Sequence, residues 1–248
     1  WLAFNTKNPK LADKRVRQAI NFAIDKKFIL ETILGGINNR ATGPLAGGSP
    51  YYSGEVEKYD LNLARATKLL DEAGLKPGAN GVRLTLDIDA IPGNADLKTI
   101  QEYLKPTLAK VGIEVNIRQS PDFPSWARRV SSQQFEMTLD SVWNWGDPVI
   151  GVHRTWLSTN IKPGVIWSNT QSYSNPKVDE WLAAAGQEMN LAKRKELYKQ
   201  VQKVVVDECP VAFLYEQTFY EAYSTKVANA PAGIWGQIDG MTETTVKA

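Results

Sequence analysis

The segment 143–148, with sequence WNWGDP, contains the residue types and spacing best suited to binding a solute. Two indoles, Trp143 and Trp145, flank the carboxamide of Asn144 directly after an alternating apolar stretch. Indole rings offer large flat apolar surfaces and one N–H donor, and residues that follow strands in open α/β sheets often face ligands. The sequence equally fits a structural role, in which one indole lies in the core and the other packs beneath a loop.

Few residues are available for catalysis or metal binding. His153 is the only histidine, and Asp87 and Asp89 are two carboxylates on one face of a predicted strand. We interpret His153 as a structural or surface imidazole, and the aspartates as the polar face or end cap of that strand. The sequence has no Walker loop, dinucleotide fingerprint or nucleophile elbow. We therefore expect no catalytic residue, no metal site and no cofactor.

The composition is that of a globular protein. Of 248 residues, 43% are hydrophobic and 23% are charged. The 29 Lys and Arg residues nearly balance 27 Asp and Glu residues without a long basic run, so nucleic-acid binding is not indicated. No apolar stretch is long enough to span a bilayer. The single cysteine, Cys209, excludes an internal disulfide and is interpreted as a small buried hydrophobe.

Local patterns predict an α/β fold. Alternating apolar residues predict strands over 82–90, 113–119 and 135–142, and the helical pattern over 96–111 predicts a right-handed crossover between the first two. A short helix is expected over 123–130, and residues 38–60 are expected to form a long ordered loop. Further helices are predicted after Asp13, after Asp25, after Asp60, after Asn175 and over 191–206. The run 211–214 predicts a buried strand after the helix break at Pro210.

Six segments together resemble the dipeptide-, oligopeptide- and nickel-importer binding proteins, the peptide-type receptors of ABC importers (family 5, cluster C). They occur in the same order as in that family, and they are 1–6, 15–29, 59–75, 135–148, 173–182 and 194–210. The resemblance implies a periplasmic-binding-protein-like (type II) lobe with a mixed sheet flanked by helices. It implies that 1–6 and 211–216 are strands crossing between two lobes, and that 7–210 is a complete second lobe. Residues 217–248 would pack on a first lobe that is otherwise absent from this chain.

The resemblance also implies that the protein binds and delivers a solute without changing it chemically. A peptide-like solute contacts both lobes, stabilises their closed arrangement, and is delivered to the membrane permease of an ABC importer. The protein is then expected to be a monomer in the periplasm or otherwise outside the cytoplasm. Opines, short oligosaccharides and a chelated metal or haem are alternative ligands, although one histidine and three methionines disfavour metal. Two alternatives belong to other classes of protein. One is an enzyme that uses Asp87, Asp89 or His153, and the other is a chaperone-like or signalling protein built on the same fold.

Two departures from the dipeptide-binding members concern the ligand's charges. Asn144 stands where those members have an acidic residue that pairs with the ligand ammonium, and an amide cannot supply that counter-charge. Ile91 stands where they have an arginine for the ligand carboxylate. Both charge clamps are therefore expected to be missing. The expected ligand-binding residues are Trp143, Asn144, Trp145, Asp147 and Ile91, with Asp147 also expected to cap the turn that follows Pro148.

Overall fold

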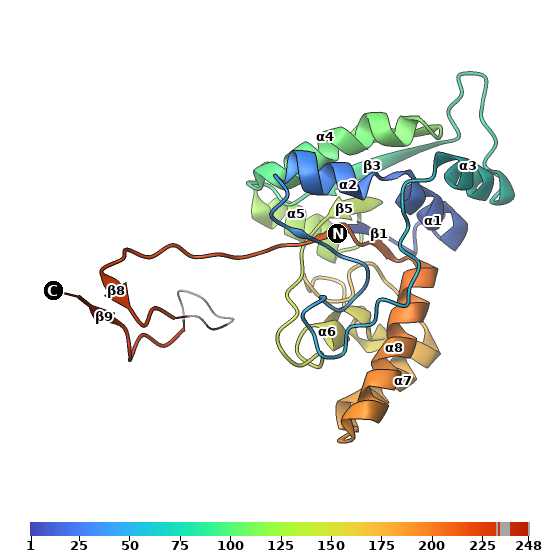
Figure 1. Ribbon diagram of the computed structural model, residues 1–248. Coiled ribbons are helices and arrows are strands. Elements are labelled where there is room, and N and C mark those ends of the chain that lie inside the picture. The colour runs from blue at the N-terminus through green and yellow to red at the C-terminus, as the bar shows by residue number, and fades with distance from the viewer. Residues whose placement is uncertain (232, 234–238, 248) are drawn as a thin grey trace. The chain divides into compact units, whose positions relative to one another are not determined.

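The computed structural model describes residues 1–231, 233 and 239–247, and it divides into two compact units, Trp1–Glu216 and Gln217–Ala248 (Figure 1). The first unit contains the mixed α/β fold. In the second, the strands β8 (Val227–Ala228) and β9 (Thr245–Val246) pair antiparallel, although the sequence there shows little regular pattern.

A five-stranded mixed sheet is the centre of the first unit. Its strands lie in the order β4-β3-β5-β1-β6, with bounds β4 Ile113–Ile117, β3 Leu84–Ala90, β5 Met137–Leu139, β1 Leu2–Phe4 and β6 Val211–Ala212. Strand β3 is parallel to both β4 and β5, whereas β1 is antiparallel to β5 and β6. The helix α4 (Ala95–Ala109) connects β3 to β4. The predicted common sheet and its crossover helix are therefore confirmed.

The alternation along the strands separates an apolar face from a polar one. Leu86, Ile88 and Met137 are fully buried in the main core, and Ile88 is opposite Met137 in the β3–β5 register. On the other face of β3 the carboxylate of Asp89 is also fully buried, and it forms ion pairs with Arg118 and Arg129. Two cations satisfy this carboxylate, so Asp89 is a structural residue in this fold.

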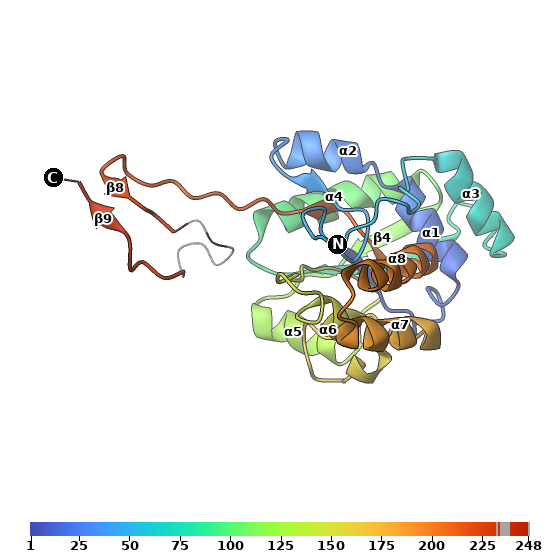
Figure 2. The ribbon, with the colours of Figure 1, turned by 60° about the horizontal axis from the view of Figure 1, so that its bottom comes forward.

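Helices cover the sheet, and three of the four predicted helix caps are confirmed. Asp13, Asp25 and Asn175 each accept a backbone N–H at the start of a helix, as predicted. The helices around the sheet are α1 (Lys14–Ala23), α2 (Lys26–Phe28) continuing into the π-helix η1 (Ile29–Ile33), α3 (Leu63–Glu72), α5 (Phe123–Ser131), α7 (Pro176–Gln187) and α8 (Leu191–Glu208). Figure 2 shows α7 and α8 side by side.

The predicted cap of α3 is wrong. Asn62, two residues after Asp60, accepts the N–H of Arg65 and begins the helix. The carboxylate of Asp60 forms an ion pair with Arg40 at 2.6 Å instead. Both residue types suit a cap, so residue type alone does not distinguish them.

The predicted long loop before α3 is ordered by contacts with the core. Its strand β2 (Asn39–Arg40) pairs with β7 (Tyr215–Glu216). Near its end, the buried ammonium of Lys26 donates to the carbonyl oxygens of Asn21 and Tyr59, each at 2.8 Å. Burial lowers the pKa of Lys26 to about 7.

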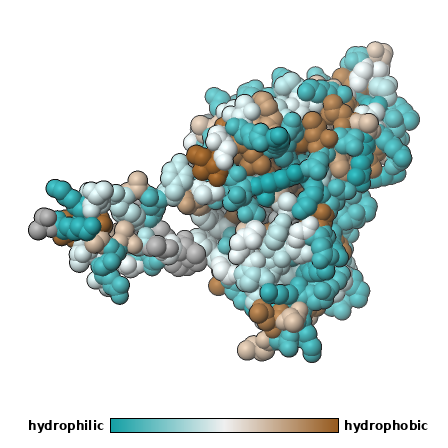
Figure 3. Space-filling view, viewed as in Figure 1, coloured by the Kyte–Doolittle hydropathy of each residue, from teal (hydrophilic) through white to brown (hydrophobic). Residues whose placement is uncertain are grey.

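One face of the molecule can be seen in the space-filling view of Figure 3. Most of the face of residues 1–216 seen in Figure 3 is hydrophilic, with hydrophobic patches among the polar residues. None of the helices that the structure describes is both long and apolar enough to cross a membrane.

Replacing Asp89 with alanine should lower the free energy of unfolding by about 3 kcal/mol, because Arg118 and Arg129 would lose the buried carboxylate that they share. Asp87→Ala is the matched control on the same strand face, since the Asp87 side chain is 39% exposed and should cost well under 1 kcal/mol. Urea denaturation of both variants measures the difference. Equal losses would contradict the structural role of Asp89.

Candidate functional site

The WNWGDP segment leaves the sheet directly after β5. Its two indoles stack on each other, with ring centroids 5.4 Å apart and planes inclined by 8°. Trp143 is 53% exposed and Trp145 is half-buried, so neither belongs to the core. The structural alternative for this pair, with one indole in the core, is therefore wrong.

An ion pair fixes the end of this segment. Both carboxylate oxygens of Asp147 accept from the guanidinium of Arg194 on α8 at 2.8 Å, and one also accepts the N–H of Val149 at 2.9 Å. The guanidinium of Arg194 lowers the pKa of Asp147 below its usual value. Arg194 in turn donates to the hydroxyl of Tyr51 at 2.8 Å and lies over that ring. The predicted turn-capping role of Asp147 is confirmed, and Arg194 adds a constraint that the sequence did not reveal.

Gly151 lets the segment pack closely against the helix α6 (Val152–Trp156). Its φ of +128° is rarely adopted by other residues, and a Cβ there would lie 2.5 Å from the carbonyl oxygen of Trp143. The same Cβ would lie 3.5 Å from Oδ1 of Asn144. A glycine at this position therefore brings the indole segment and α6 together.

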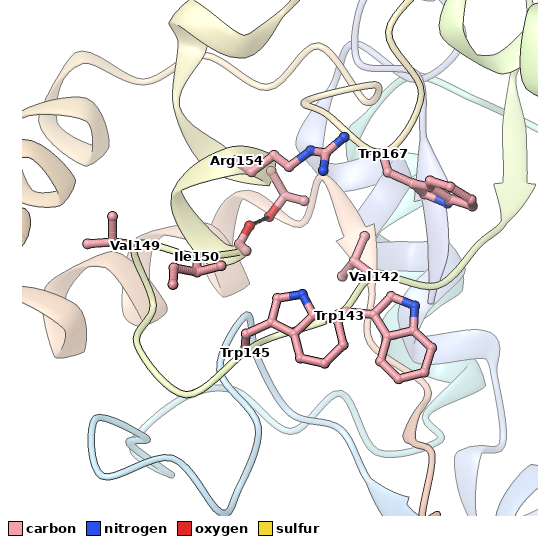
Figure 4. A pocket seen from close by; sticks show the side chains of 9 residues that line it. Val142, Trp143, Trp145, Val149, Ile150, Arg154 and Trp167 are labelled. Carbon is pink, nitrogen blue, oxygen red and sulfur yellow. Dashed lines mark hydrogen bonds between the residues drawn. The ribbon is translucent and has the colours of Figure 1, made fainter. Parts of the chain in front are cut away.

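A pocket of about 360 Å³ lies between the indole segment and α6 (Figure 4). Its walls are mainly apolar and aromatic, a lining typical of sites for small solutes. The lining residues are Val142, Trp143, Trp145, Val149, Ile150, Gly151, Arg154, Thr155 and Trp167. In Figure 4 the guanidinium of Arg154 extends toward Trp167, across the opening from Trp143 and Trp145.

Three of the predicted site residues are not among the pocket's lining residues. Asn144 uses its carboxamide nitrogen to donate to the carbonyl oxygen of Pro44 at 3.0 Å. Asp147 is engaged by Arg194, as described above. Ile91 is half-buried against the core just after β3, and its N–H donates to Leu139. Trp143 and Trp145 are thus the two predicted residues that the structure brings together in the pocket wall.

Sequence reasoning missed Trp167 and Arg154. Trp167 lies in an aperiodic stretch with a left-handed φ of 55°, and its indole N–H donates to the carboxylate of Asp140 at 3.2 Å. Burial raises the pKa of Asp140 to about 6. Arg154 is on the short helix α6. No local pattern in the sequence connects either residue with the WNWGDP segment.

The alternative catalytic residues do not converge on a site. His153 is buried and shares a hydrogen bond of 2.9 Å between its Nε2 and the hydroxyl of Tyr198. Burial lowers the pKa of His153 to about 4, so the imidazole is neutral near pH 7. Asp89 is paired with two arginines in a different part of the fold. Within residues 1–231, 233 and 239–247, no three His, Cys, Asp or Glu side chains form a group that could hold a metal ion.

Comparisons with known proteins place the chain in a family. Residues 1–164 match the model of the bacterial extracellular solute-binding proteins, family 5, middle region. The chain therefore belongs to this family of solute-binding proteins, which confirms the resemblance found in the sequence and assigns it to binding proteins rather than enzymes.

Individual relatives agree with this assignment. The chain is 30% identical to the heme-binding protein A of Haemophilus influenzae over 217 residues, which are 85% of this chain and 38% of that protein. It is 25% identical to a dipeptide-binding protein of Pseudomonas aeruginosa over 234 residues, covering 92% of this chain and 42% of that protein.

Solved structures confirm the fold class. The structure of HbpA2 from Haemophilus parasuis superposes with a TM-score of 0.84 at 22% identity, covering 100% of this chain and 48% of that chain. The chain thus spans less than half the length of the relatives that it matches.

Replacing Arg194 with methionine should free the WNWGDP segment, because both oxygens of Asp147 would lose their bonds to the guanidinium. We expect backbone amides of residues 143–151 to exchange with solvent at least several-fold faster, and the free energy of unfolding to fall by about 1–2 kcal/mol. Hydrogen-exchange mass spectrometry measures the first effect. Lys195→Met, on an exposed neighbour in α8, is the control, and unchanged exchange in Arg194→Met would show that the pair does not hold the segment.

Proposed function

We propose that this chain is part of the substrate-binding component of an ABC importer, which captures a peptide or peptide-like solute and delivers it to a membrane permease. The observation that carries the proposal is the pocket beside WNWGDP, in which two stacked indoles form part of the wall directly after β5. Family membership and the relative named as a dipeptide-binding protein support the same role. We propose a location outside the cytoplasm, in the periplasm or its equivalent, and a monomeric state.

The proposed mechanism is closure of two lobes around the solute. In this account residues 7–210 form one lobe, 1–6 and 211–216 are crossing strands, and 217–248 pack on the opposite lobe. The pocket described above would then be one wall of the site. The lengths of the relatives support a two-lobed protein, since these two relatives each have more than twice as many residues as this chain. Lobe closure stabilises the bound state because the solute contacts both walls.

Within the site we propose a separate role for each predicted residue. Trp143 and Trp145 stack against the solute. Asn144 donates to Pro44 through its nitrogen, while its Oδ1 borders the pocket at Gly151 and accepts a hydrogen bond from the solute. Asp147 positions the segment, and Ile91 adds apolar surface at the end of β3.

A flat cofactor-like solute is a second candidate. The relative named heme-binding protein A and the three indoles of the pocket favour it. His153 is engaged with Tyr198, so haem would have to bind here by stacking and not through a histidine ligand. Titration with haem beside the peptide panel separates the two candidates.

Trp143→Ala and Trp145→Ala should each weaken solute binding by about 10-fold or more, because each removes an aromatic stacking surface worth about 1–3 kcal/mol. Isothermal titration of the complete gene product with a panel of di- and tripeptides measures the effect. Phe28→Ala is the control, since this exposed aromatic lies outside the pocket lining and should leave affinity unchanged. If both tryptophan variants bind as the wild type does, the pocket is not the site.

Asn144→Asp should improve binding of peptides with a free ammonium relative to their N-acetylated forms, because a carboxylate supplies the counter-charge that the amide lacks. The substitution also loses the bond to Pro44, so affinity for acetylated peptides should fall. Titrating matched free and acetylated peptides against wild type and variant gives the ratio of affinities. An unchanged ratio would remove Asn144 from the site.

A further inference from the structure

Among the residues that the structure describes, the pocket wall contains one ionised side chain and no acid. Arg154 is the charged member of the lining residues, and the other eight are apolar, aromatic, glycine or threonine. Its guanidinium donates from Nη2 to the carbonyl oxygen of Ile166 at 3.2 Å. Within the part of the chain that the structure describes, Arg154 takes part in no ion pair.

The carboxylates near the pocket are engaged elsewhere. Asp147 is held by Arg194 and by the N–H of Val149. Asp140 accepts from the N–H of Ser141 at 2.7 Å and from the indole of Trp167, and it is buried. Neither forms an ion pair with Arg154, so the positive charge of the guanidinium is left for a group that enters the pocket.

The surroundings of Arg154 suit a carboxylate. Guanidinium is planar and can donate two parallel hydrogen bonds to a carboxylate, an arrangement that is stronger than a neutral hydrogen bond. Arg154 and Trp143 are both exposed in this chain, so the proposed closure of a second lobe would be needed to exclude water and strengthen an ion pair there. Figure 4 shows the guanidinium across the opening from the stacked indoles, so one solute can reach both.

We infer that Arg154 binds a free carboxylate of the solute while Trp143, Trp145 and Trp167 hold an adjoining apolar or aromatic group. This inference rests on the proposed solute-binding function and names the chemistry that the pocket selects: the C-terminal residue of a peptide-like solute. The carboxylate clamp that is missing at Ile91, after β3, is then supplied from α6. The lining residues that the structure describes include no corresponding acid for an ammonium group.

The test uses the complete gene product and two probes, a tripeptide ending in phenylalanine with a free carboxylate and the same tripeptide as its C-terminal amide. Affinities are measured by isothermal titration for wild type, Arg154→Gln, Arg154→Lys and the control Lys98→Gln. Lys98 is an exposed lysine on α4 outside the pocket lining, so its variant removes the same charge elsewhere. Melting temperatures report whether each variant is folded.

We expect wild type and Lys98→Gln to bind the acid about 10-fold or more tightly than the amide. The ratio should approach one in Arg154→Gln and take an intermediate value in Arg154→Lys. Equal binding of acid and amide by wild type, or a ratio unchanged in Arg154→Gln, would overturn the role of Arg154 and leave the proposed function standing. If neither probe nor any peptide of the wider panel binds, the proposed peptide-binding function fails together with this inference.

Discussion

The ion pair between Asp147 and Arg194 is the contact on which the candidate site depends. It joins the WNWGDP segment to α8 across 47 residues of sequence, with both carboxylate oxygens engaged at 2.8 Å. Tyr51 supports the guanidinium from a third part of the chain. A mobile loop loses conformational entropy when it binds a solute. A loop that is already held in place by an ion pair avoids much of that loss.

The position of β5 in the sheet determines where the WNWGDP segment lies. Strand β5 lies between β3, which is parallel to it, and β1, which is antiparallel, so the chain leaves β5 at the edge where β3 also ends. Ligands of α/β proteins commonly bind at such carboxyl ends of strands. Gly151 then allows α6 to approach the segment closely enough to form the opposite wall of the pocket. The fold therefore explains why the site forms at this position, and the side chains explain what it can bind.

Features encoded by neighbouring residues could be predicted from the sequence. The strands around Leu86, Val115 and Met137 follow from period-two alternation, and the caps at Asp13 and Asn175 follow from residue type beside a helical pattern. The mistaken choice of Asp60 over Asn62 has a different origin. Two suitable caps lie two residues apart, and in the structure Asn62 caps the helix while Asp60 pairs with Arg40, 20 residues away in the sequence.

Contacts between residues distant in sequence also limited how much of the site could be predicted. Trp143 and Trp145 could be identified because they directly follow a predicted strand, whereas Trp167 and Arg154 come to the pocket from an irregular stretch and a five-residue helix. Their proximity arises from tertiary packing, and a single sequence carries no local signal of it. The charge of the pocket could not be predicted for the same reason, since it depends on which arginine remains unpaired after Asp147 and Asp89 have taken their partners.

The most direct test of this account is a crystal structure of the complete gene product with a bound peptide. The account predicts that the solute packs against Trp143 or Trp145 with ring contacts of roughly 4 Å and that Asp147 remains paired with Arg194. A solute that binds between the lobes without touching the pocket lined by these indoles would contradict it.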